Sequence, residues 1–169
     1  MRYHNITTDD MLNGDGLRVV LWVAGCEHHC AGCQNPLTWD HNNGLYFDNA
    51  AMQEIYSELD KDYISGITLS GGDPLHPANR DYTLDWIARS VKKMFYKTVW
   101  LYTGYLWEEV KDLPGMKFVD VLVDGPYREE LKDVNYPWAG STNQRVIDVQ
   151  KSLELGSVVL YKTNGYKNT

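Results

Sequence analysis

The segment LRVVLWVAGCEHHCAGC occupies residues 17–33 and decides the fold, because a buried strand leads directly into a loop of cysteines. Residues 17–24 form a short, almost continuously apolar run rich in β-branched side chains, which is typical of a strand buried on both faces. The loop that follows contains Cys26, Cys30 and Cys33, the three cysteines of the chain. These thiols are therefore expected at the carboxyl end of a buried strand.

Three thiolates on one loop fit a cubane 4Fe–4S cluster, in which they ligate three irons and leave the fourth iron open. An open iron can bind a substrate directly. The alternative is a structural zinc site with three cysteines and His28 or His29 as the fourth ligand. Zinc sites usually combine pairs of ligands from separate segments, whereas these cysteines share one loop, which favours the cluster. Both histidines are then expected to donate hydrogen bonds beside the ligands or to face solvent.

The composition indicates an ordinary globular domain. The chain has 169 residues, 43% of them hydrophobic and 23% charged, and we expect a single domain over residues 1–163 with a flexible tail at 164–169. The formal charge of −7 does not suggest a nucleic-acid partner. No apolar stretch approaches the roughly 18 residues of a membrane span, and the first residues, Met-Arg-Tyr-His-Asn, lack the apolar segment expected of a signal peptide. Clustered cysteines without an export signal predict metal binding in a reducing cytoplasm.

The rest of the chain alternates between apolar strands and amphipathic helices. We predict further strands at 64–69, 98–102, 118–123, 145–149 and 157–161, and helices at 48–59, 81–95 and 107–111. This alternation predicts an α/β fold with a parallel sheet, and each polar or glycine-rich motif follows a strand, where such folds place their sites. An eight-unit barrel needs roughly 200 residues or more, so we expect a partial, open (β/α)6-type barrel.

The run Cys26-x-x-x-Cys30-x-x-Cys33 after the first strand, with Gly71-Gly72-Asp73-Pro74 after the second, resembles the radical S-adenosylmethionine superfamily. The resemblance implies two cofactors, one 4Fe–4S cluster on the three cysteines and S-adenosylmethionine chelated to the open iron. One electron from the cluster then cleaves the sulfonium to methionine and a 5′-deoxyadenosyl radical. Since the cofactors carry this chemistry, no side chain is predicted to act as a catalytic acid, base or nucleophile.

Five residues outside the cysteine loop are predicted to bind the cofactor. Gly71 and Gly72 let the backbone approach its amino group without an intervening Cβ, and Asp73 supplies a negative charge there. Asp124, after the fourth strand, binds the ribose or a cation, or caps the next turn. Arg145 pairs with the methionine carboxylate or with an acidic loop of a partner, or braces the C-terminal strands.

Three further segments resemble one subfamily, the activating proteins of anaerobic ribonucleoside-triphosphate reductases. They are Asn13-Gly14-Asp15-Gly16, Val123-Asp124-Gly125-Pro126-Tyr127 and Gly140-Ser141-x-Asn143-Gln144-Arg145, and the resemblance runs from about Tyr3 to about Leu160. It implies that a hydrogen atom is taken from a glycine of the large reductase subunit, which leaves a glycyl radical. It also implies a flavodoxin-like electron donor.

The chain departs from the superfamily pattern at two positions. Gly32 stands just before the third cysteine, where many radical enzymes place an aromatic residue against the adenine. Asp15 stands where the subfamily usually has a proline, so the turn that Asn13 begins is less stiff. Asn143 and Gln144 are expected to be loop-stabilising amides.

Two other functions remain open from the sequence. The first is activation of a different glycyl radical enzyme such as pyruvate formate-lyase, although those activases are generally longer and some carry extra cysteine-rich segments. The second is a non-enzymatic module that binds metal or transfers electrons, which would not cleave S-adenosylmethionine.

Overall fold

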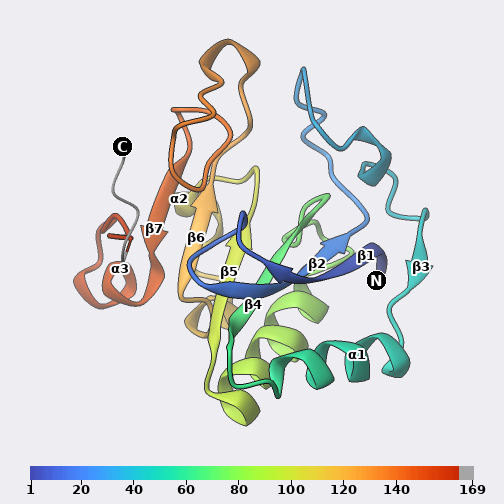
Figure 1. Ribbon diagram of the computed structural model, residues 1–169. Coiled ribbons are helices and arrows are strands. Elements are labelled where there is room, and N and C mark those ends of the chain that lie inside the picture. Colours follow the sequence, from blue (N-terminus) through green and yellow to red (C-terminus); the bar gives the residue numbers. More distant parts are fainter. Residues whose placement is uncertain (164–169) are drawn as a thin grey trace.

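The computed structural model describes residues 1–163, and the tail predicted at 164–169 lies outside the described residues. The described chain forms one mixed α/β unit around a seven-stranded sheet (Figure 1). In chain order, the strands are β1 (Arg2–Asp10), β2 (Leu17–Val23), β3 (Leu45–Tyr46), β4 (Ile64–Gly71), β5 (Thr98–Tyr102), β6 (Val121–Asp124) and β7 (Arg145–Asp148). Across the sheet, their order is β3-β1-β2-β4-β5-β6-β7. The six-unit partial barrel stays a prediction.

The parallel sheet predicted from the sequence is confirmed for its centre. β2, β4, β5 and β6 pair in parallel, whereas β1 and β7 pair antiparallel with the strands beside them. The parallel direction expected for β7 is therefore wrong, because the long loop of residues 125–144 returns the chain so that β7 runs antiparallel beside β6. The strand predicted at 157–161 is also wrong, since this segment runs beside β7 with a single isolated bridge, between Leu160 and Ile147, and does not form a strand.

The three predicted helices begin near the predicted residues, whereas the helix at residues 149–155 was not predicted. The helical elements are α1 (Asn49–Leu59), two consecutive helical segments (Asp81–Ala88 and Val91–Phe95), α2 (Trp107–Val110), α3 (Val149–Leu155) and short 3₁₀ turns at Pro36–Thr38, Pro114–Phe118 and Glu129–Leu131. Asp48 caps α1, because its side chain accepts a hydrogen bond from the backbone N–H of Ala51 at 2.9 Å. No helix in the part of the chain described here is long and apolar enough to cross a membrane.

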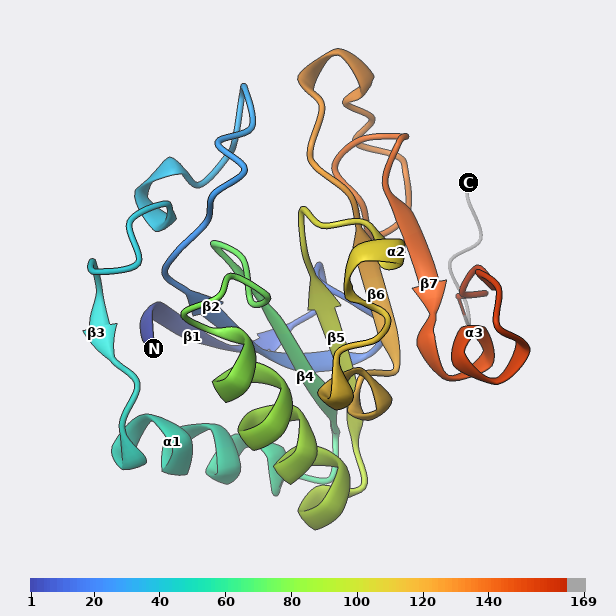
Figure 2. The same ribbon diagram turned by 180° about the vertical axis from the view of Figure 1, so that it is seen from behind.

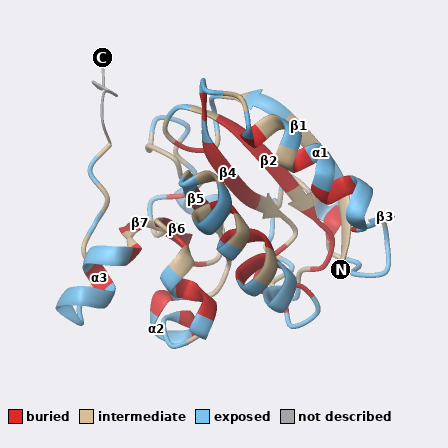
Figure 3. Cartoon of the chain, turned by 90° about the horizontal axis from the view of Figure 1, so that it is seen from below, coloured by how far each residue is buried: buried red, intermediate tan, exposed pale blue. Residues whose placement is uncertain are grey.

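The two faces of the sheet differ in chemistry because successive side chains point to opposite sides of each strand. One face is apolar and packs against α1, α2 and the helical segments at residues 81–95 (Figure 2). Its central strands contribute Val19, Leu21, Ile67, Leu69, Val99, Leu101 and Leu122, all fully buried. Figure 3 shows this buried layer beneath helices whose outer sides are exposed.

The opposite face carries most of the polar and aromatic side chains of the central strands. Placed by the strand register, they are Arg18, Trp22, Thr68, Ser70, Trp100 and Tyr102, with Val20, Val121 and Val123 on the same face. On this face, Trp22, Ser70 and Tyr102 are the last side chains of β2, β4 and β5, so they lie at the carboxyl edge of the sheet. Figures 1 and 2 show the cysteine loop and the loop after β6 rising from this same edge. The polar face and these two loops enclose the site described next.

Candidate functional site

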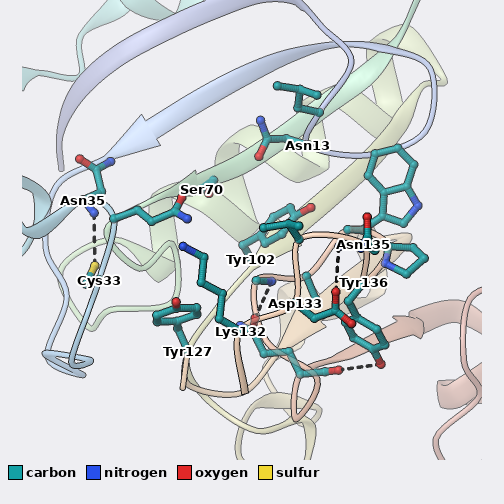
Figure 4. Close-up of a pocket in the computed structure, with 18 of the residues that line it drawn as sticks. Asn13, Cys33, Asn35, Ser70, Tyr102, Tyr127, Lys132, Asp133, Asn135 and Tyr136 are labelled. Carbon is teal, nitrogen blue, oxygen red and sulfur yellow. Dashed lines mark hydrogen bonds between the residues drawn. The ribbon is translucent and has the colours of Figure 1, made fainter. Parts of the chain in front are cut away.

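An open cleft of about 1180 Å³ lies over the polar face at the carboxyl ends of the parallel strands (Figure 4). Four segments far apart in the sequence line it. They are the β1–β2 turn (Met11, Leu12, Asn13), the strand ends (Trp22, Ser70, Gly71, Tyr102), the cysteine loop (Cys33, Gln34, Asn35) and the loop after β6 (Tyr127, residues 132–140 and Gln144). The topology therefore brings the cysteine loop and the glycine segment to one cavity, as predicted from their positions after β2 and β4.

The three cysteines are free thiols, each partly exposed. Cys33 lines the cleft, and its Sγ accepts a hydrogen bond from the backbone N–H of Asn35 at 3.4 Å. Burial raises the pKa of the Cys26 thiol to about 11. In the described chain, no three His, Cys, Asp or Glu side chains are arranged as ligands of a metal ion. The fit to an iron–sulfur cluster therefore rests on the donor set, three free soft thiols on one loop, of which Cys33 lines the cleft.

Gly71 and Gly72 permit close packing between the end of β4 and the cysteine loop. A Cβ at residue 72 would lie 2.5 Å from the carbonyl oxygen of Gly25 and 2.8 Å from that of Thr38. Gly71 has a φ of +107°, and a Cβ there would lie 2.5 Å from the backbone nitrogen of Val23. Both positions therefore require glycine in this fold. Their predicted approach to the amino group of a cofactor stays a prediction.

Hydrogen bonds between backbones hold the base of the cysteine loop. The N–H of Gly25 donates to Thr38 O at 2.7 Å, and the N–H of Cys26 donates to Trp39 O at 3.0 Å. Just after β4, the N–H of Asp73 donates to Gly25 O at 2.6 Å. The backbone around Cys26 is thus held by hydrogen bonds to residues 38 and 39 and to the glycine segment.

Asp73 is buried and lies outside the cleft lining, with 1% of its side chain exposed. Its Oδ2 accepts hydrogen bonds from Nε2 of His28 at 2.7 Å and from the N–H of Gly104 at 3.0 Å. Thr103 Oγ1 donates to the same carboxylate at 2.9 Å, and the N–H of Leu75 donates to its Oδ1 at 2.8 Å. The carboxylate thus joins the cysteine loop to the ends of β4 and β5. The hydrogen bond between Asp73 and His28 raises the pKa of His28.

Asp124 and Arg145 pair with each other on the helix side of the sheet. Asp124 shares its face with Leu122, is fully buried, and accepts a hydrogen bond from the N–H of Trp107 at 2.7 Å. Arg145 lies opposite Asp124 in the β6–β7 register, and its Nη2 is 2.5 Å from Asp124 Oδ2 and 2.9 Å from Glu108 Oε2. The hydrogen bonds to Asp124 and then Glu108 raise the pKa of Arg145. These contacts match the capping and bracing alternatives from the sequence.

Gln144 and Asn143 fix the wall of the cleft that follows β6. Oε1 of Gln144 accepts from the N–H groups of Gly140 at 2.9 Å and Ser141 at 3.1 Å, and its Nε2 donates to Gly125 O at 2.9 Å. Asn143 Nδ2 donates to Pro126 O at 2.8 Å. The expectation that both amides stabilise a loop is therefore confirmed.

The structure explains why residue 32 is a glycine. Gly32 has a φ of +72°, and a Cβ there would lie 2.5 Å from Cδ of Glu129, in the loop after β6. An aromatic side chain at this position would need an unfavourable backbone conformation and would displace Glu129. The close contact between the cysteine loop and the loop after β6 therefore explains why residue 32 is glycine and not an aromatic residue.

Sequence reasoning did not single out Trp22 and Lys132. Trp22 could have been found from strand alternation, because it is a register partner of Ser70 beside the glycine segment. Lys132 carries the positive charge in the cleft lining of the described chain, yet it sits in an irregular loop with no motif around it. In Figure 4 its amino group points into the cavity.

Two comparisons with known proteins identify the family. A model of the 4Fe-4S single cluster domain family matches residues 12–147, which include all three cysteines and the four parallel strands. An anaerobic ribonucleoside-triphosphate reductase-activating protein of Enterobacteria phage T4 is 44% identical over 146 residues, which are 86% of this chain and 93% of that protein.

Proteins of the same name from bacteria are similar to this chain. The Escherichia coli K12 protein is 40% identical over 150 residues, covering 86% of this chain and 97% of the relative. The Haemophilus influenzae protein is 38% identical over 148 residues, covering 85% and 96%. The chain therefore belongs to the family of anaerobic ribonucleoside-triphosphate reductase-activating proteins, which has a 4Fe-4S single cluster domain.

Proposed function

We propose that this chain is a radical S-adenosylmethionine enzyme that generates the glycyl radical of an anaerobic ribonucleoside-triphosphate reductase. The observation that carries the proposal is the loop of three free cysteines beside an open cleft, in which Cys33 and the end of β4 line the same cavity. The name shared by relatives that align over most of the chain supports the choice of target. The reducing cytoplasm is the compartment proposed, because the thiols must stay reduced.

In this proposal, Cys26, Cys30 and Cys33 would hold three irons of one 4Fe–4S cluster, and S-adenosylmethionine would bind the fourth iron. The bound cofactors supply one electron and, by reductive cleavage, methionine and a 5′-deoxyadenosyl radical that takes a hydrogen atom from a glycine Cα. A flavodoxin-like protein is the proposed source of the electron. The protein's own contribution is to bind and orient the cofactors and to exclude competing reactions.

Four residues that line the cleft are proposed to bind and orient the cofactor. Gly71 leaves the backbone at the end of β4 accessible from the cavity, where the amino group of the cofactor is proposed to bind. Lys132 supplies the positive charge for the cofactor's carboxylate, since Arg145 is already paired with Asp124 and Glu108. Trp22 and Tyr102 provide aromatic surface beside that position. These proposed roles are supported by the presence of all four residues in the cleft lining.

An open cleft also suits a polypeptide substrate. Large apolar side chains remain exposed at its edges, with Met11 63%, Leu12 79% and Val134 84% exposed. Met11 and Leu12 lie in the β1–β2 turn, whereas Val134 lies in the loop after β6. A loop of the reductase that enters the cleft would contact these apolar groups and carry its glycine toward the cofactor.

The test is an anaerobic incubation of the reduced, iron-reconstituted chain with S-adenosylmethionine and the large subunit of an anaerobic reductase. The expected results are a glycyl radical signal in electron paramagnetic resonance and release of 5′-deoxyadenosine. Replacing Cys26, Cys30 or Cys33 with alanine should abolish both. A colourless protein that holds one zinc ion under strict anaerobiosis would overturn the proposal. A radical formed on pyruvate formate-lyase, and not on the reductase, would change the target.

A further inference from the structure

His28 connects the cysteine loop to the interior of the protein. It lies between Cys26 and Cys30, yet only 18% of its side chain is exposed. Its Nε2 donates to Oδ2 of Asp73 across 2.7 Å, a contact that joins residues 45 positions apart in the sequence. A hydrogen bond from a ring N–H to a buried carboxylate is among the stronger hydrogen bonds in proteins.

The imidazole ring of His28 fits tightly against the turn after β5. A Cβ at Gly104 would lie 2.4 Å from Cδ2 of His28, so the ring occupies the space that a side chain at residue 104 would need. The ring of Tyr105 packs against it edge to face, with 4.6 Å between ring centroids. The ring is therefore held by a hydrogen bond and by two neighbours from another strand end.

The adjacent His29 has a different environment. Its side chain is exposed and packs on Trp39, with 4.7 Å between ring centroids. Trp39 belongs to the same long loop, so this contact does not connect the loop to the sheet. Of these two neighbouring histidines, His28 is the one bonded to a buried group of the sheet edge.

We infer that His28 is a positioning residue, whose bond to Asp73 fixes the turn between Cys26 and Cys30 so that the thiolates face one bound cluster. The inference rests on the proposed function, in which these cysteines ligate iron. Ligand loops that are ordered in advance lose less conformational freedom on binding, so the cluster is retained longer. His28 itself does not contact the substrate and does not ligate iron in this scheme.

The test compares variants of the full chain that separate the size of the side chain from its hydrogen bond. His28→Leu keeps much of the volume and removes the donor, whereas His28→Gln keeps an N–H donor at a similar reach. His29→Gln is the matched control in the same loop. Gly104→Ala perturbs the same contact from the other side, because its Cβ displaces the imidazole.

The measurement is the rate at which an iron chelator removes iron from the anaerobically reconstituted protein, with the resonance spectrum of the reduced cluster recorded alongside. His28→Leu and Gly104→Ala should lose iron about tenfold faster or more, the size expected for one lost hydrogen bond to a charged group. The Gln variants of His28 and His29 should stay within about twofold of the wild type.

The outcomes separate this inference from the proposed function. If the wild-type chain assembles no 4Fe–4S cluster, the proposed function fails. If it does assemble one and His28→Leu retains it as long as the wild type, the positioning role alone fails. Equal loss from His28→Gln and His28→Leu also contradicts the role, because the hydrogen bond would then not be what matters. If His28→Leu does not fold, Gly104→Ala and His28→Gln decide the question by the same rates.

Discussion

Replacing Gly72 with alanine should loosen the cysteine loop and lower the stability of the whole protein. The new Cβ would lie 2.5 Å from Gly25 O and 2.8 Å from Thr38 O, both backbone atoms that cannot turn away. The collision costs about 1–3 kcal/mol as overpacking. The 2.6 Å hydrogen bond from the N–H of Asp73 to Gly25 O would lengthen at a cost of about 1 kcal/mol. The total is roughly 2–4 kcal/mol.

The assay is thermal unfolding of the iron-free protein, followed by iron content after reconstitution. For a chain of this length, about 1 kcal/mol corresponds to roughly 2–4 °C, so the Tm should fall by about 4–16 °C. Gly156→Ala is the matched control, because residue 156 has a φ of +72° and nothing within 4 Å of a new Cβ. It should cost only about 1 kcal/mol and leave iron content unchanged. A Gly72→Ala variant as stable as this control would refute the reasoning.

Three further predictions concern the other contacts of the site. Arg145→Ala leaves the buried carboxylate of Asp124 without its cation and should lower the free energy of unfolding in urea by about 1–3 kcal/mol; an unchanged midpoint would contradict the bracing role. Lys132→Ala should weaken S-adenosylmethionine binding about 5–10-fold by calorimetry without changing Tm, whereas Lys132→Arg should keep the affinity. Gln144→Leu removes the acceptor of the Gly140 and Ser141 amides, so hydrogen exchange at both should accelerate about tenfold or more, and unchanged exchange would refute the bracing of this wall.

The elements that the sequence predicts best are those with a strong local pattern. The strand at 98–102 has the predicted bounds, and Asp48 caps the first helix as expected. β1 was not predicted, because residues 2–10 are mostly polar and the strand is only partly buried. Its stability comes from antiparallel pairing with β2, a contact that no local pattern in residues 2–10 contains.

The arrangement of the site was predictable only in part. The positions of the cysteine loop and the glycine segment after two strands were enough to place both at one edge, since parallel strands end on the same side. The direction of Asp124 was not predictable, because alternation assigns it to the face of Leu122 but does not say which face carries helices. The bond between His28 and Asp73 joins residues 45 apart and depends on the packing of three strand ends.

The two buried carboxylates at this edge have a common physical reason. Where parallel strands end, the loops that follow leave backbone N–H groups without partners, and a buried N–H needs an acceptor. Asp73 accepts the N–H groups of Leu75 and Gly104, and Asp124 accepts those of Trp107 and Arg145. Since one carboxylate can accept several hydrogen bonds, an acidic residue at the end of such a strand can bind the loop that follows it and also a neighbouring strand or helix. Recognition of a cofactor then depends on groups that point into the cleft and remain unengaged, so Lys132 is a better candidate for charge recognition than Arg145.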